Sequence, residues 1–517
     1  MHKDVHLNIL TVSPIIQGFG MRIISSSVSL FLALLTLPGD NLAANTSEFQ
    51  KWLDTETTSF KEYRDKRDKE FTGFLKDQWK EMQTFQGLVR DDKPKPVRIP
   101  KAPDIPTSEV PDSKEPTVEK PVTEPVIVKV KPLLSEPVKK PRTPTLADKR
   151  LPGRKVSFNF YGHMLNFYYD PKLIVRATRP INEKTISSIW SSMSLANYDS
   201  LLKQLVAQKK PLALNDWGFV LLTHTLAQRL HPGNRNDQSV FTWYLLTKAG
   251  FNSRIAYDRN YIYLLLSSRQ QLYEAPYFIF DNIRYYALSF DGIKQKPGRI
   301  FTYNGHYPDA THKLDMRLDK SIKTQRQQKD RYLDFDFNKK HYRIAASYDT
   351  QTVKYLQTYP QMDIQMYFNS SVNSVTANPI LNQLKPLVEG KSEEDAVNLL
   401  LKFVQTAFRY KTDQQQFGIE NYLFPEETLH YPYSDCEDRS VFFAWLVHNL
   451  LGLNVIGLDY PGHIATAVNF SSRVSGDSVL YKGKKYTISD PTYINAKAGM
   501  TMPLYSKHAP GIINILN

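Results

Sequence analysis

The chain has a single cysteine, Cys436, and this residue has the clearest capacity for chemistry. One thiol excludes an intramolecular disulfide framework and cysteine-cluster zinc or iron–sulfur sites. It leaves a buried structural thiol, an intermolecular disulfide or a catalytic nucleophile. His463 and Asp490 follow at equal separations of 27 residues. A thiol, an imidazole and a carboxylate are the parts of a nucleophile, its general base and the group that orients the base.

A helix is expected to carry the thiol. The apolar run from 441 to 451 ends at Gly452, and Asp435 or Ser434 is a suitable N-cap, so Cys436 falls in the first turn. The unpaired N–H groups and dipole of a helix start favour a thiolate. The acidic residues around the cysteine oppose this effect. A cationic imidazole nearby would tip the balance towards the thiolate.

Strands are expected to carry the other two residues. Residues 455–458 and 463–468 predict two strands joined by a Pro461-Gly462 turn, and His463 opens the second strand. A further strand over 486–488 leads to Asp490, which would fix the tautomer of the imidazole. An oxyanion hole needs two donors. The backbone N–H of Cys436 is one, and the candidates for the other are Tyr431, Tyr433 and His430.

This arrangement resembles the transglutaminase-like superfamily, which shares the papain-type catalytic core. The matching features are the Cys436-Glu437-Asp438 run, the Gly at the helix end, the Gly462-His463 turn and the Ser489–Thr492 segment. The resemblance implies that Cys436 is the nucleophile, His463 the base and Asp490 the orienting group. The sequence departs from the family pattern at Ser440, where Ala is usual, and in having no Trp after His463. The second departure concerns the substrate groove.

The resemblance implies a cysteine hydrolase or acyl-transferase that acts on protein or peptide amides and uses no metal or organic cofactor, and the N-terminal signal pattern predicts that it is exported. Transfer to water is favoured over transfer to an amine, because bacterial relatives as a group are often peptidases. The alternative is a non-enzymatic envelope adaptor or assembly protein, in which the same fold binds proteins. A weaker alternative is a structural domain whose thiol forms an intermolecular disulfide.

The region from 151 to 517 contains an internal repeat. Strand pairs ending near 170 and 349 are each followed by paired helices, by matching segments at 238–241 and 439–442, by a Gly and by further strands. This order predicts an α+β fold of two tandem transglutaminase-like domains, 151–330 and 331–517. The second copy has an extra segment, 409–433. Aligning the copies puts Arg235 opposite Cys436, Tyr261 opposite His463, and Phe290 or Asp291 opposite Asp490, so the first copy lacks the triad.

The N-terminal third is predicted to be non-catalytic. Residues 1–20 resemble upstream read-through, and 21–44 have the order of a signal peptide, with an uncleaved anchor or a buried helix as alternatives. Residues 45–90 predict an amphipathic helix, whose apolar stripe over 47–86 would form a coiled coil, dock on an envelope protein partner or fold back. Residues 91–150 predict an extended linker, since 13 of the 32 prolines lie between Lys93 and Pro144.

The charge pattern bears on partners and location. The net charge is +14, but five of these charges come from the linker and no basic run is interleaved with aromatic residues. We therefore expect no nucleic-acid binding. No cysteine follows the apolar run of the signal, so no lipid anchor is expected. The expected location is periplasmic or secreted, or the inner membrane if the signal stays uncleaved.

Overall fold

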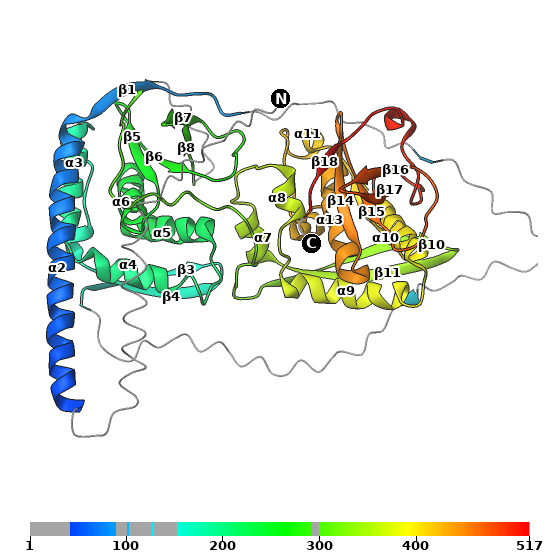
Figure 1. Cartoon of the computed structure of the whole chain (residues 1–517), viewed down its shortest axis with the longest axis horizontal. Helices are drawn as coiled ribbons and strands as arrows, with labels where there is room; N and C mark the ends of the chain where they lie inside the picture. Colours follow the sequence, from blue (N-terminus) through cyan, green and yellow to red (C-terminus); the bar gives the residue numbers. More distant parts are fainter. Residues whose placement is uncertain (1–41, 89–100, 103–125, 128–151, 291–298, 516–517) are drawn as a thin grey trace, which may run out of the picture. The chain divides into compact units, whose positions relative to one another are not determined.

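The computed structural model describes residues 42–88, 101–102, 126–127, 152–290 and 299–515 (Figure 1). Helices and strands are both abundant, which confirms the α+β class. The predicted read-through and most of the signal segment, 1–41, lie outside the described residues. Among the residues that are described, no helix combines the length and apolar character that crossing a bilayer requires.

The helix α2, Leu42–Asp77, ends earlier than predicted. After it, β1 (Trp79–Gln83) pairs antiparallel with β9 (Arg299–Tyr303), so the prediction of one helix over 45–90 was wrong at its C-terminal end. Trp79 and Met82 are spaced three apart, which fits one face of a helix, but the pairing with β9 makes this segment a strand. Phe71 and Leu75, near the helix end, are buried in the core of the first repeat.

The part of α2 that precedes Lys69 belongs to a separate compact unit. Four large apolar side chains on it are exposed to solvent, namely Trp52, Leu53, Phe60 and Tyr63. The prediction that the helix folds back therefore describes its last turns, and the partner of the remaining stripe stays a prediction.

The first repeat is a hairpin, four helices and an antiparallel sheet. Its sheet order is β1-β9-β5-β6-β8-β7. Its elements are β3 (Arg154–Phe160), β4 (His163–Tyr169), η1 (Pro171–Leu173), α3 (Glu183–Ser194), α4 (Tyr198–Ala207), α5 (Asp216–Leu230), α6 (Arg235–Lys248), β5 (Ser253–Tyr257), β6 (Ile262–Ser267), β7 (Tyr277–Phe280), β8 (Ile283–Ala287) and β9.

The second repeat follows the same plan with inserted elements. Its larger sheet has the order β16-β17-β15-β14-β18. Its elements are β10 (Gln328–Phe337), β11 (Lys340–Asp349), α7 (Thr350–Leu356), α8 (Ile364–Phe368), α9 (Ser374–Val388), α10 (Glu393–Ala407), β12 (Arg409–Tyr410), α11 (Asp413–Gln416), α12 (Pro425–His430), β13 (Tyr433–Ser434), α13 (Cys436–Leu451), β14 (Asn454–Tyr460), β15 (His463–Asn469), β16 (Ser478–Tyr481), β17 (Lys484–Ile488), η2 (Pro503–Tyr505) and β18 (Gly511–Ile513).

The two sheets correspond strand by strand. In chain order, β5, β6, β7, β8 and β9 take the same places in the first sheet as β14, β15, β16, β17 and β18 take in the second. Each sheet is preceded by a helix, α6 or α13, and each repeat opens with an antiparallel hairpin, β3–β4 or β10–β11. This correspondence supports the duplication inferred from the sequence.

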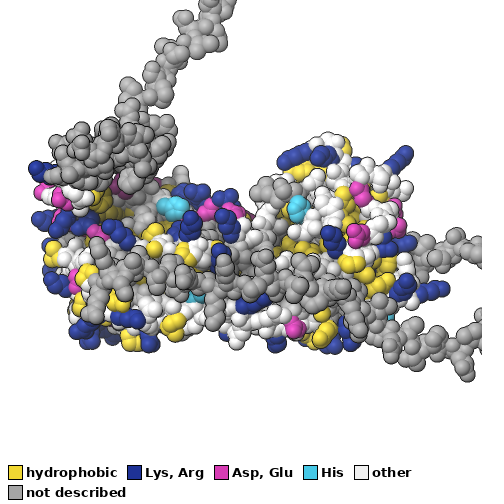
Figure 2. Space-filling model, turned by 90° about the horizontal axis from the view of Figure 1, so that it is seen from below, with side chains coloured by type: hydrophobic (Ala, Val, Ile, Leu, Met, Phe, Trp, Pro, Cys, Tyr) yellow, Lys and Arg dark blue, Asp and Glu magenta, His cyan; other side chains and the backbone are white. Residues whose placement is uncertain are grey.

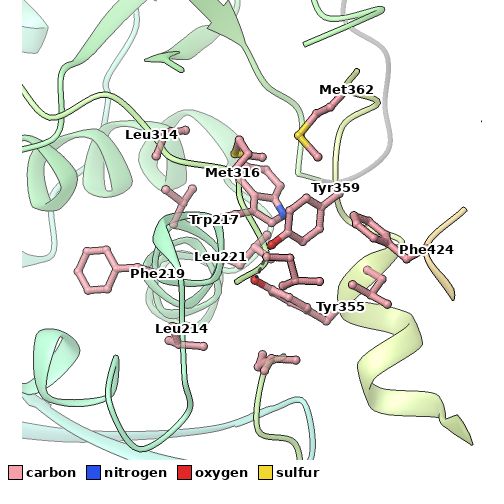
Figure 3. Close-up of a cluster of buried hydrophobic side chains, with 14 of the residues drawn as sticks. Leu214, Trp217, Phe219, Leu221, Leu314, Met316, Tyr355, Tyr359, Met362 and Phe424 are labelled. Atoms are coloured by element: carbon pink, nitrogen blue, oxygen red, sulfur yellow. Dashed lines mark hydrogen bonds between the residues drawn. The ribbon is translucent and has the colours of Figure 1, made fainter. Parts of the chain in front are cut away.

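The two repeats share one hydrophobic core. Both lie in the compact unit Lys69–Asn517, and a single cluster of buried side chains runs through them. In Figure 3 the rings of Trp217, from α5, and of Tyr355 and Tyr359, from α7 and just after it, lie together at the junction. The Asn215 side chain caps α5 and also joins both tyrosine hydroxyls, at 2.7 Å from Tyr359 and 2.8 Å from Tyr355.

Two short pieces of the predicted linker are described, and both pair with the second repeat. The buried Ala102 donates its N–H to the carbonyl of Ile494 at 2.8 Å. The strand β2, Val126–Ile127, runs parallel to β11. The other linker residues lie outside the described ranges, so the prediction of an extended spacer stays a prediction for them.

Basic side chains do not form one patch on the face drawn in Figure 2. Lys and Arg side chains are spread over that face, among acidic, polar and apolar ones. The expectation that the chain does not bind nucleic acid remains a prediction.

Candidate functional site

The helix α13 begins at Cys436, as the sequence predicts. Asp435 is its N-cap, and the Asp435 N–H donates to the Asp438 carboxylate at 3.2 Å, one half of a capping box. At the other end, Gly452 adopts the left-handed conformation (φ 66°) that closes a helix. The thiol therefore sits at the positive end of a 16-residue helix.

A hairpin and a following strand bring the imidazole and the carboxylate together. His463 is the first residue of β15 and pairs with Tyr460 across the turn. Asp490 comes two residues after β17, which pairs with β15. Nε2 of His463 lies 2.8 Å from Oδ2 of Asp490, and both side chains are almost fully buried.

Backbone contacts fix the orientation of this pair. The second carboxylate oxygen of Asp490 accepts the N–H groups of Thr492 (2.8 Å) and Tyr493 (3.2 Å). The Asp490 carbonyl accepts from the side-chain amide of Gln405 at 3.1 Å. Since the carboxylate holds the proton on Nε2 of His463, Nδ1 is left as the basic nitrogen. Nδ1 is buried and has no hydrogen-bond partner among the described residues.

The thiol helix is tied to the histidine strand. One turn after Cys436, the hydroxyl of Ser440 donates to the carbonyl of Ile464 at 3.0 Å, next to His463. The thiol itself donates to the carboxylate of Glu437 at 3.0 Å. This bond favours the protonated thiol, because a carboxylate accepts the proton that catalysis would pass to the imidazole.

Tyr505 is a neighbour of the triad that the sequence gave no reason to select. Its ring stacks on that of His463, with centroids 5.1 Å apart and 11° between the planes. Burial raises the pKa of Tyr505, and the charges of Cys436 and Asp490 raise it further. The hydroxyl is therefore within electrostatic range of both the thiol and the carboxylate. The only local signal is an aromatic residue after Pro503, in a loop far from the motif.

The three predicted catalytic side chains are closed off from solvent. Their residues are 0% (Cys436), 2% (His463) and 2% (Asp490) exposed. Any molecule could reach the thiol only after some of the side chains packed around it had moved.

Buried carboxylates surround the start of α13. Oxygens of Asp413, Asp435 and Asp438 lie within 4.8 Å of one another. Burial, followed by the charges of Asp435 and Glu437, raises the pKa of Asp438 well above its usual range. These three carboxylates are the residues that could hold a cation here.

A guanidinium already supplies positive charge beside this acidic group. The fully buried Arg439 donates to the carbonyls of Phe408 (2.7 Å) and Gln405 (3.4 Å) and to the Ser434 hydroxyl (3.3 Å). Burial lowers the pKa of Arg439 to about 10, while the neighbouring Asp435 and Asp438 act in the opposite direction. Arg439 remains charged at neutral pH and offsets part of the buried negative charge.

The oxyanion candidates are engaged in other contacts. The hydroxyl of Tyr431 accepts from the amide of Gln357 at 2.8 Å, and its ring packs edge-on against Phe417. Tyr433 lies in β13, with the ammonium of Lys411 4.1 Å from its ring centroid. The ring of His430 packs against Tyr348 and Tyr431. These contacts give each of the three aromatic residues a packing role, and an oxyanion role for them stays a prediction.

In the first repeat, the positions that correspond to the triad hold other residues. Arg235 is the first residue of α6, as Cys436 is of α13. Strand pairing puts Ile262, rather than the predicted Tyr261, at the place of His463, since Ile262 faces Tyr257 as His463 faces Tyr460.

The position that corresponds to Asp490 also differs by one residue from the prediction. Counting from the ends of β8 and β17 puts Ser289 at the place of Asp490, next to the predicted Phe290. The other predicted residue, Asp291, lies outside the described ranges.

Two buried glutamates in α12 predict a pH-dependent stability. Burial raises the pKa of Glu427 to about 8 and that of Glu426 to about 7. Between pH ~4.5 and those values, the carboxyls are protonated when folded and ionised when unfolded, so the free energy of unfolding falls as the pH rises. We expect Glu427→Gln to add roughly 3–5 kcal/mol at pH 8 and less than about 1 kcal/mol at pH 5, measured by urea unfolding.

The glutamine in this variant can still accept the Phe424 N–H, which lies 3.1 Å from the Glu427 carboxylate. Glu389→Gln, at an exposed position, is the control and should have little effect at either pH. A gain for Glu427→Gln of the same size at pH 5 and pH 8 would contradict the assignment of a protonated Glu427.

No family model, curated protein or solved structure matches this chain. The likeness to the transglutaminase-like superfamily therefore rests on the residues and the geometry given above.

Proposed function

We propose that this protein is a transglutaminase-like cysteine hydrolase, a peptidase or amidase, with Cys436 as nucleophile, His463 as base and Asp490 as the group that orients the base. The observation that carries the proposal is the buried contact of 2.8 Å between His463 Nε2 and Asp490 Oδ2, which leaves Nδ1 without a partner among the described residues. An imidazole held in this way needs a proton donor on its other side, and a thiol at a helix start supplies one.

The proposed reaction uses only side chains of the second repeat. The Cys436 thiol turns from Glu437 to His463 and gives its proton to Nδ1. The thiolate attacks the carbonyl carbon of an amide, and the imidazolium returns the proton to the leaving amine as the C–N bond breaks. Water then attacks the thioester and regenerates the thiol. Transfer of the acyl group to an amine differs only in this last step.

The proposed location is outside the cytoplasm, on the signal-like pattern of residues 21–44. The proposed substrates are therefore proteins or peptides of the envelope or the medium.

A second function, a non-enzymatic adaptor, is favoured by one observation. The triad is buried and the thiol donates to Glu437 instead of facing a substrate channel. In that reading both repeats serve as binding domains, and the Cys436 environment contributes only to packing.

The pH at which the thiolate forms distinguishes the two functions. The chain has one cysteine, so any thiolate signal comes from Cys436. The ultraviolet absorbance of the thiolate is followed against pH in the wild type and in His463→Ala, with Cys436→Ser as the blank. We expect a thiolate that persists well below pH 8 in the wild type and is lost in His463→Ala. In Glu437→Gln the thiolate of Cys436 should persist to lower pH, because the negative charge beside the thiol has been removed.

Absorbance does not require a reagent to enter the closed site, so burial does not obscure the result. A thiol that titrates near its ordinary value of about 8.5 in both proteins would overturn the enzymatic proposal and favour the adaptor. A covalent dimer on non-reducing gels that is absent in Cys436→Ser would instead assign the thiol to an intermolecular disulfide.

A further inference from the structure

A buried threonine hydroxyl joins the strand of His463 to the residue before Asp490. Thr466 lies on β15, three residues after His463, and its hydroxyl donates to the carbonyl of Ser489. The N–H of Ser489 in turn donates to the carbonyl of Thr466 at 2.8 Å. Thr466 therefore binds both backbone groups of Ser489, and both residues are 0% exposed.

This contact stands at the end of the pairing between β15 and β17. The strand β17 ends at Ile488, which faces Ala467, and Asp490 lies two residues further on. The bonds between Thr466 and Ser489 continue the pairing by one residue, so Asp490 directly follows a residue that is held to β15. A functional side chain keeps its direction when the groups next to it are hydrogen-bonded in this way.

A second buried hydroxyl joins the helix of the thiol to the same strand. Ser440 lies one turn after Cys436 in α13, and its hydroxyl donates to the carbonyl of Ile464, the residue after His463, at 3.0 Å. Residues four apart in a helix lie on the same face, so this bond holds to β15 the face of α13 that carries Cys436. The strand β15 is thus bonded through one hydroxyl to the thiol helix and through another to the segment that leads to the carboxylate.

The first repeat, which has no triad, has no threonine at the corresponding place. Three residues after Ile262, the counterpart of His463, stands Leu265, which is buried in a hydrophobic cluster. A leucine has no hydroxyl to hold a neighbouring carbonyl. The serine one turn into the helix is common to both copies, as Ser239 and Ser440. The threonine is therefore the hydroxyl that distinguishes the copy with the triad from the copy without it.

We propose that Thr466 is a positioning residue of the triad, which through Ser489 holds the Asp490 carboxylate against Nε2 of His463, while Ser440 holds the thiol helix at the same strand. Both hydroxyls bond to backbone carbonyls, so each acts through a neighbour of a triad residue. A catalytic constellation must be held to within about 0.5 Å, and a displacement of about 1 Å can lower a rate on the order of 100-fold. The effect on rate rests on the proposed function, and the effect on the contact between His463 and Asp490 does not.

The first readout is the proton on Nε2 of His463, which can be observed in the full chain whether or not the protein turns over a substrate. A proton in a buried hydrogen bond to a carboxylate gives a downfield resonance in the proton magnetic resonance spectrum. His463→Ala and Asp490→Ala identify this resonance by its loss. We expect Thr466→Val to lose the resonance through faster exchange with water, and Thr466→Ser, which keeps the hydroxyl, to retain it.

The second readout is the rate at which p-nitrophenyl acetate acylates Cys436, with Cys436→Ser as the blank. We expect Thr466→Val to slow acylation roughly 10- to 100-fold, and Thr466→Ser to restore most of the rate. Ser440→Ala should also slow acylation but should leave the Nε2 resonance in place. The reason is that this change loosens the thiol helix and leaves the contact between His463 and Asp490 intact.

Thr302→Val is the matched control. Thr302 lies on β9, is 0% exposed, and its hydroxyl donates to the carbonyl of Ile255, on the neighbouring strand β5, at 2.9 Å. This variant should lower the thermal midpoint about as much as Thr466→Val does, but the resonance and the acylation rate should stay those of the wild type. Thr466→Ala, a second variant without the hydroxyl, should behave as Thr466→Val and replaces it if the valine variant does not fold.

The Nε2 resonance decides the outcome. A resonance that is unchanged in Thr466→Val would overturn the proposal and leave Thr466 with a role in stability alone. Absence of the resonance from the wild type would also overturn it, because the contact that Thr466 is proposed to hold would then not be held. A wild type that shows the resonance without any Cys436-dependent acylation would defeat the hydrolase, while the resonance in Thr466→Val would still decide the positioning role.

Discussion

Replacing Arg439 with methionine is expected to lower the free energy of unfolding by about 3–5 kcal/mol, which is typical of removing one member of a buried charged group. Methionine has a similar length and fills most of the space, so the loss reports the guanidinium and not a cavity. The carbonyls of Phe408 and Gln405 lose a donor, and so does the Ser434 hydroxyl. The carboxylates at the start of α13 lose their nearest buried cation.

The loss should depend on pH. Burial and like charges raise the pKa of Asp438, so this carboxyl takes up a proton readily as the pH falls. A neutral carboxyl does not need the guanidinium, and the destabilisation by Arg439→Met should therefore be smaller at pH 5 than at pH 8. Urea unfolding at both pH values, followed by tryptophan fluorescence, gives the two numbers.

Arg343→Met is the matched control, because the Arg343–Asp334 pair, 2.7 Å apart, lies on the exposed side of β11. Exposed ion pairs contribute little, so this variant should unfold close to the wild type. An equal loss for Arg439→Met at both pH values would assign Arg439 to packing and neutral hydrogen bonds alone.

The elements of the triad could be predicted because their signals are local. A cap before Cys436, a Gly at the end of the helix and a Pro-Gly turn before His463 each act within a few residues. The positions of these elements therefore follow from short stretches of sequence, and the structure has them where the pattern indicates. The repeat was visible for the same reason, since the order of strands and helices repeats along the chain.

The parts that were missed depend on contacts between distant segments. Tyr505 reaches His463 from η2, 42 residues later, and nothing in the intervening sequence marks it. Arg439 reads as an exposed residue of an acidic first turn, but the packing of α13 against α10 buries it. Trp79 lies in a strand and not in the predicted helix, because β1 pairs with β9, more than 200 residues later in the chain. Tertiary pairing decides each of these, and local propensity does not encode it.

Removing the carboxylate of Asp490 is expected to have the largest effect on the proposed chemistry. In Asp490→Ala the imidazole loses the bond that holds its tautomer, and the Thr492 and Tyr493 N–H groups lose their acceptor. Loss of the orienting group in such triads lowers the rate by roughly 10³- to 10⁴-fold. The measurement is acylation of Cys436 by p-nitrophenyl acetate, read as release of p-nitrophenolate, with Cys436→Ser as the blank.

Two matched variants separate orientation from charge and access. In Asp490→Asn the single amide oxygen can still accept the two N–H groups, so the turn should be kept. The amide NH2 then faces Nε2 of His463 and favours the opposite tautomer, so the rate should fall about as far as in Asp490→Ala. Tyr505→Ala removes the ring stacked on His463 and leaves the contact of 2.8 Å between His463 and Asp490 in place. It should not slow acylation, and it should speed it if the tyrosine limits entry.

The acylation rates of these variants distinguish a catalytic His463–Asp490 pair from a structural one. If the His463–Asp490 pair serves catalysis, Tyr505→Ala keeps the wild-type rate while Asp490→Asn and Asp490→Ala both lose it, and Asp490→Asn does so with little change in thermal midpoint. If the pair only closes the turn after β17, Asp490→Ala lowers the thermal midpoint while the Cys436-dependent rate stays that of the wild type. The second outcome would leave His463 as a buried core residue and make the adaptor the better account of both repeats.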